Sequence, residues 1–141
     1  MIMEEVEYRM SLEDDLHAMA MSLGADLYGI ADLRPYQVAV VRQGGAIVSD
    51  YQFAISMGIR LLDTIMDQIP NRSQRAVRVS YRSHTYDVVN GRLDQISSLL
   101  AGSLQKEGYR SMPVPSSERI DDESICAMFS HKMAAHLAGL G

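Results

Sequence analysis

The sequence predicts an α/β or α+β domain, with a small central sheet covered by helices, and two observations support this. A long run between Ser83 and Gly108 repeats apolar residues at three- and four-residue steps, which is the spacing of one helix face. Elsewhere, short apolar runs of strand length alternate with helical patterns. A broad apolar helix face must cover another surface, and a sheet is the simplest such surface.

Bulk composition indicates one ordinary globular domain. We expect residues 1–10 to be frayed and residues 11–141 to form a single domain. A net charge of −5 argues against a nucleic acid as the main partner, and no run of 18 apolar residues is present to span a membrane. The acidic N-terminus is unlike a signal peptide, which predicts a cytoplasmic protein. A single cysteine, Cys126, allows neither an internal disulfide nor a cysteine-ligated cluster.

The first third of the chain predicts a helix followed by a strand. Ser11 and Asp14 fit a capping box, which begins a helix whose apolar stripe runs to residue 23 and which Gly24 ends. Residues 26–32 predict a short buried strand, in which Gly29 permits another backbone to approach closely.

The middle of the chain carries weaker signals. Residues 35–43 have the composition of a strand, but Pro35 at the start and Gly44 at the end favour a helix, which we predict. Residues 51–58 predict a core strand, and residues 59–69 a helix that the following proline stops. Residues 71–82 hold four arginines and predict a solvated connection, or alternatively a basic patch for an anionic ligand.

The long amphipathic helix is predicted to begin at Ser83 as the N-cap and to close at Gly108. Residues 109–112 then predict a third short strand, which two prolines stop. Ser130 is predicted to cap a last short helix, which Gly139 closes.

Few residues suggest chemistry on their own. Asp121, Asp122 and Glu123 form an acidic cluster in which one carboxyl group could keep its proton near neutral pH, although an acidic first turn of a helix is the simpler interpretation. His131 and His136 are five residues apart, which does not suit a metal pair on one helix face. Motifs alone therefore do not support an enzyme.

Four stretches taken together carry a family resemblance: HAMAMSLGADLYGIADL (17–33), YQFAISMGIRL (51–61), HTYDVVNGRLDQISSLLAGSLQKEGYRSMPVP (84–115) and FSHKMAAHLAGLG (129–141). In order and spacing the chain resembles the N-terminal part of the epoxyqueuosine reductase-like proteins, a family of cobalamin-dependent iron–sulfur reductases. The resemblance implies a nitroreductase-like core that holds cobalamin.

The family takes electrons through two [4Fe–4S] clusters in a C-terminal ferredoxin-like domain, which requires about eight cysteines. With one cysteine, this chain is expected to hold no iron–sulfur cluster and to need a ferredoxin-like iron–sulfur partner. The family continues where this sequence stops, and a truncated chain, a natural fragment and a stand-alone paralogue are all open alternatives.

The resemblance also implies site residues. Asp121 or Asp122 is nearest to the family's proton donor. The positions that match the family's cofactor region are Tyr86, Ser130, His131, Lys132, Ala138, Gly139 and Gly141.

Two functions follow as expectations. The first is a corrinoid-binding domain that acts with an iron–sulfur partner. The second is a non-catalytic interaction module that keeps the fold and forms a homodimer through an open sheet edge.

Overall fold

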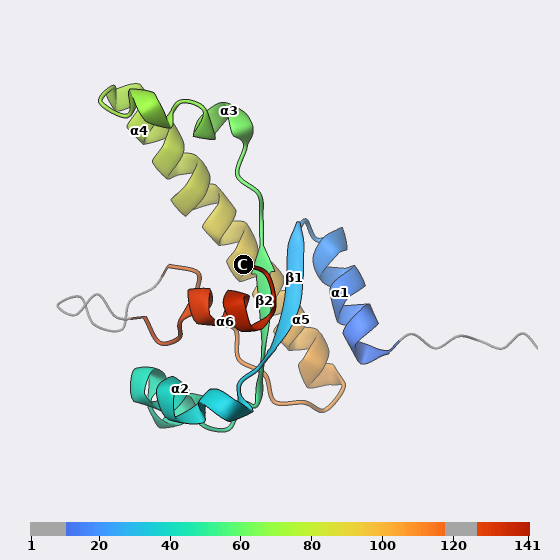
Figure 1. Ribbon diagram of the computed structural model, residues 1–141. Coiled ribbons are helices and arrows are strands. Elements are labelled where there is room, and N and C mark those ends of the chain that lie inside the picture. Colours follow the sequence, from blue (N-terminus) through green and yellow to red (C-terminus); the bar gives the residue numbers. More distant parts are fainter. Residues whose placement is uncertain (1–10, 118–126) are drawn as a thin grey trace, which may run out of the picture.

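The computed structural model describes residues 11–117 and 127–141, and within them the fold is of the α+β class (Figure 1). Strands β1 (Leu27–Asp32) and β2 (Phe53–Gly58) form an antiparallel pair, in which the first residue of each strand faces the last residue of the other. The sheet of the described residues therefore has two strands, one fewer than the sequence predicts.

Helices cover both faces of this sheet. Helices α1 (Leu12–Ser22) and α5 (Asn90–Lys106) lie on one face, and the short helix α6 (His131–Leu137) lies on the other (Figure 1). Two separate hydrophobic clusters result. The cluster under α1 and α5 is built on Leu16, Ala20, Ala25, Ile96 and Leu100. The cluster under α6 is built on Ala31, Leu33, Val40, Val48, Phe129 and Ala134.

Several predicted elements are confirmed. Ser11 and Asp14 form the capping box, and Gly24 follows α1 with a φ of 106°, which favours glycine. The ambiguous middle segment is helical: η1 (Arg34–Tyr36) leads into α2 (Gln37–Gly44), and η2 (Ala46–Val48) follows.

The helix predicted over residues 59–69 is wrong. The structure has only α3 (Asp63–Met66) and the single turn η3 (Ile69–Asn71) in this region. Residues 59–62 stay extended because distant side chains bond to their backbone. The N–H of Arg60 donates to the Asp26 carboxylate at 2.7 Å, and that of Leu62 donates to the His84 ring at 3.2 Å.

The predicted start of the long helix at Ser83 is also wrong, as is the connection over residues 71–82. Helix α4 (Arg75–Arg82), the π-helical stretch η4 (Ser83–Val89) and α5 run on as one continuous helix. Arginine and alanine have high helix propensity, so a helix forms here although it is mostly solvated. We call residues 60–82, which contain α3, η3 and α4, the arm, because these elements project away from the sheet (Figure 1).

The third strand predicted over residues 109–112 does not form. After the helix closes at Gly108, which has a φ of 90°, the chain turns back along α5 and not along the sheet. The Ser111 hydroxyl donates to the Ala101 carbonyl at 2.8 Å, and Met112 and Val114 pack against the cluster under α6. These contacts hold residues 109–115 against α5 and α6.

Candidate functional site

The start of α6 holds three of the predicted cofactor residues. The Ser130 hydroxyl accepts the N–H of Met133 at 3.2 Å and caps the helix, as predicted. The His131 Nε2 donates to the carbonyl oxygen of Pro115 at 2.9 Å. Lys132 is exposed. Two of the three side chains are thus already used to fix α6, and Lys132 makes no such bond within the described part of the chain.

The turn after α6 lies directly on the sheet. A Cβ on Gly29 would stand 2.8 Å from the Ala138 carbonyl oxygen and 3.0 Å from its Cβ, so β1 and this turn touch because Gly29 has no side chain. Gly139 and Gly141, with φ values of 76° and 149°, face open space, since a Cβ on either would meet nothing within 4 Å. The prediction of a close backbone approach at Gly29 is confirmed.

Tyr86 lies in η4, one turn before Asn90, and is 57% exposed. The start of α5, and not Tyr86 itself, is linked to α6 through the loop that follows α5. Ser116 donates its hydroxyl to the Asn90 carbonyl at 3.3 Å and its N–H to the Asp94 carboxylate at 2.8 Å. The neighbouring Pro115 carbonyl receives the His131 bond, so one loop connects the start of α5 to α6. Insertions of π-helical geometry are frequent at functional sites.

The predicted proton donors Asp121 and Asp122 lie outside the described residues, as does Cys126. Within residues 11–117 and 127–141, no group of three or more His, Cys, Asp or Glu residues could hold a metal ion. In the same part of the chain, no helix is long and apolar enough to cross a membrane.

The predicted cofactor residues do not line a walled cavity that we describe. Gly139 and Gly141 of the turn are exposed, as are Tyr86 and His131, so each is accessible to a ligand. The two cavities that we describe both lie in the arm, and none of these residues lines either one. The exposed residues of α6 and its turn are thus compatible with contact to one side of a planar group such as a corrin ring, and in the described part of the chain no hydrogen bond joins Tyr86 to them.

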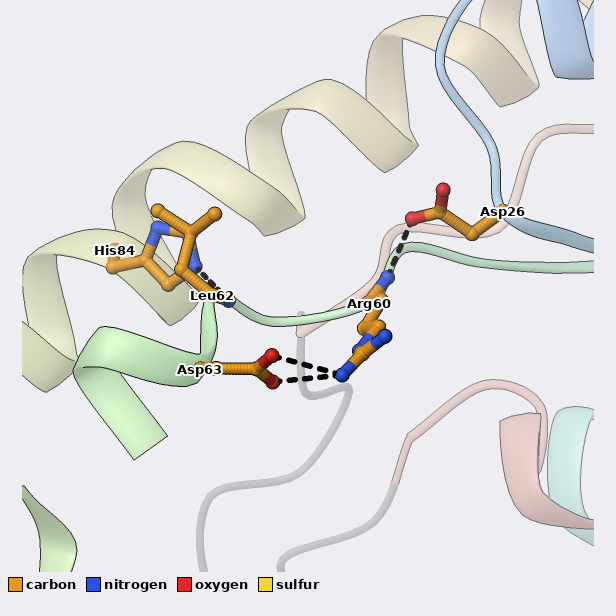
Figure 2. Close-up of polar contacts among 5 residues, drawn as sticks. All are labelled: Asp26, Arg60, Leu62, Asp63 and His84. Carbon is orange, nitrogen blue, oxygen red and sulfur yellow. Dashed lines mark hydrogen bonds and ion pairs between the residues drawn. The ribbon is translucent and has the colours of Figure 1, made fainter. Parts of the chain in front are cut away.

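Sequence reasoning missed a polar cluster at the base of the arm (Figure 2). The Asp26 carboxylate accepts the Arg60 N–H, and one Nη of Arg60 donates to both oxygens of Asp63 at 2.9 Å. The His84 Nε2 accepts the N–H of Leu62. The His84 ring thereby fixes the start of α3. No local spacing in the sequence signals these contacts, because they join residues 22 and 34 apart.

A second ion pair fixes the far end of the sheet. Arg34 donates to both oxygens of Asp32 at 2.9 and 2.7 Å, and these bonds hold the pKa of Asp32 below its ordinary value. The Arg34 guanidinium also lies 5.1 Å from the Phe53 ring centre.

Tyr28 packs against the cluster under α1 and α5. Burial raises the pKa of Tyr28, whose hydroxyl has no hydrogen-bond partner among the described residues.

Comparisons with protein-family models, with curated proteins and with solved structures found no match for this chain.

Proposed function

We propose that this chain is the corrinoid-binding part of an epoxyqueuosine reductase-like protein, built on a nitroreductase-like core, whose redox chemistry needs an iron–sulfur partner. One observation carries the proposal. The four stretches that carry the resemblance hold the elements that pack together around the sheet, namely α1 and β1, β2, α5 with its loop, and α6 with its turn. The third stretch also includes η4, which contacts α4 and α5. Most of the segment between the second and third stretches forms the arm, outside this body (Figure 1).

In this proposal the turn from Ala138 to Gly141 lies against the cofactor. Glycines let a backbone approach a planar ring closely, and Lys132 and Tyr86 can bond to or stack on its amide-bearing rim. The cofactor would supply the reactive cobalt, and the chain's own residues bind and orient it. Asp121 or Asp122 is the proposed proton donor to the substrate.

Calorimetric titration with hydroxocobalamin tests this proposal, and the chain offers matched controls. Lys106→Gln, at the end of α5, changes the only other lysine, and Tyr109→Ser changes another exposed tyrosine. We expect Lys132→Gln and Tyr86→Ser each to weaken binding about fivefold, the effect of one lost hydrogen bond or contact, while the controls change it less than about twofold. No binding at about 100 μM cobalamin, or equal effects of all four variants, would contradict the proposal.

A second function, a homodimerising module, has its own support in β2. The N–H of Leu33 donates to the Gln52 carbonyl at 2.8 Å, which extends the β1–β2 ladder by one pair of residues. In an antiparallel pair every second residue bonds to the partner strand, so the N–H and C=O groups of Phe53, Ile55 and Met57 point away from β1. Strand β2 carries no charge and no proline, the devices that usually protect an edge. A second copy could pair along it and make a four-stranded sheet, which is more stable than two strands alone.

Sedimentation velocity tests the dimer. Pairing predicts a dimer at micromolar concentration and its loss in Phe53→Pro, because proline removes one outward N–H at a strand start that tolerates it. A wild-type chain that sediments only as a monomer in this range would contradict the second function.

A further inference from the structure

The arm has no hydrophobic core of its own. No side chain from Arg60 to His84 is buried, although the arm is rich in apolar residues. Leu62 and Val79 are each 57% exposed, and Met66 is 38% exposed. Short helices are marginal in water unless an apolar face is covered. The apolar face of the arm is therefore suited to a ligand that covers it.

The uncovered face is hollow. Between α3, η3 and α4 lies a cavity of about 570 Å³, lined by Met66, Ile69, Arg72, Val77, Arg78 and Tyr81. This volume falls within the range of small-molecule sites, which are mostly apolar with a few convergent polar groups. The walls here are apolar or aromatic except for two guanidinium groups.

Charge around the cavity is mainly positive. Residues 68–83 carry four arginines and no acidic residue, while Asp67 lies next to Met66 and Asp63 is paired with Arg60. No ion pair of these four arginines occurs in the part of the chain that the structure describes. The whole chain carries −5, so the remaining residues carry −9 together. Such segregation of positive charge on one projecting element attracts anions to it.

The two cavity arginines have different roles. Arg78 donates Nη1 to the carbonyl oxygens of Arg72 and Ser73, at 2.9 and 2.7 Å, and so closes the turn before α4. The side chain of Arg72 makes no hydrogen bond or ion pair that we describe, and it is exposed at the cavity. Arg72 is thus available for an anionic group.

We propose that the arm cavity binds a long-chain carboxylate, with the alkyl chain along Met66, Ile69, Val77 and Tyr81 and the carboxylate at Arg72. An unbranched chain covers an open apolar hollow without needing polar partners. A guanidinium binds a carboxylate with two parallel hydrogen bonds. This site is distinct from the proposed corrinoid face, because the residues that line the cavity include none of the predicted cofactor residues.

Titration calorimetry with sodium dodecanoate below its micelle concentration tests the site. We expect one molecule per chain, with binding weakened about tenfold in Arg72→Gln because a charge-assisted hydrogen bond is lost. The substitution keeps the Arg72 carbonyl that Arg78 needs, so the turn is retained. The matched control is Arg75→Gln, which removes the same charge from α4 at a position that does not line the cavity, and it should change binding less than about twofold.

Two further binding measurements separate the alternatives. Dodecyltrimethylammonium has the same chain and the opposite charge, and it should bind at least about tenfold more weakly than dodecanoate. Vesicles of anionic phospholipid should not retain the protein more than neutral vesicles do. An equal loss of dodecanoate affinity in Arg72→Gln and Arg75→Gln would show general charge attraction and would overturn the proposal. Equal binding of the cationic chain, or binding to anionic vesicles without binding of free dodecanoate, would likewise overturn the proposal.

Discussion

Gly29→Ala gives the sharpest test of how α6 and its turn are placed. The new methyl group would stand 2.8 Å from the Ala138 carbonyl oxygen, whereas carbon and oxygen normally stay more than 3 Å apart. Both sides of the contact are backbone or Cβ atoms, so the turn must move as a unit by several tenths of an ångström. Overpacking of this kind costs about 1–3 kcal/mol of unfolding free energy. Urea unfolding followed by circular dichroism measures this cost.

Gly102→Ala is the matched control, since it adds the same methyl group in the interior of α5, where a Cβ meets nothing within 4 Å. Alanine is favoured over glycine in a helix by about 1 kcal/mol, so this variant should be stabilised. The two variants should therefore shift the unfolding midpoint in opposite directions. A Gly29→Ala chain as stable as the wild type would refute the contact between β1 and the turn.

Three further predictions follow from local contacts. His84→Ala should remove the bond to the Leu62 N–H, costing about 1 kcal/mol locally, and amide exchange should accelerate at the start of α3 with little change in the global midpoint. Leu100→Ala should cost about 2–5 kcal/mol in urea unfolding because Leu100 is buried, while Leu99→Ala, 47% exposed, should cost less than about 1 kcal/mol. Because hydrogen bonds lower the pKa of Asp32 in the folded chain, its stabilisation is present above an unfolded pKa of 3.8 and is lost as pH falls through the folded pKa. Acid unfolding of Asp32→Asn should therefore be shallower below that pH than acid unfolding of the wild type.

The elements that the sequence predicted well are those whose signals are local. The capping box at Ser11 and the glycines at 24, 108 and 139 act on their immediate neighbours, so their spacing suffices. The close approach at Gly29 was also predictable, because a glycine within a strand permits it. Apolar periodicity likewise placed α1, β1 and most of α5.

Two of the three errors fall where distant contacts override local pattern. Residues 59–62 read as helix, but Asp26 and His84 hold their backbone extended. Ser83 reads as a cap, but the helix passes through it because the preceding arginines sustain a solvated helix. Residues 109–112 read as a strand, but the Ser111 side chain ties the segment to α5. The partners that hold residues 59–62 and Ser111 are distant in the sequence, whereas the helix through Ser83 reflects the helix propensity of its neighbours.

The candidate site was predictable only in part. The pattern around Ser130 indicated the cap and the turn, and the structure brings these residues to β1. The arm cavity gave no sequence signal beyond four arginines, because its walls come from three separate elements. The link from Asn90 to α6 through Pro115 and Ser116 is tertiary and left no pattern to detect.

Amide hydrogen exchange with and without hydroxocobalamin tests the proposed cofactor face most directly, because it reports where a ligand binds. We predict slower exchange in residues 129–141 and around Tyr86, and unchanged exchange in the arm. No change anywhere, or protection confined to residues 60–82, would contradict a corrinoid site on α6 and its turn.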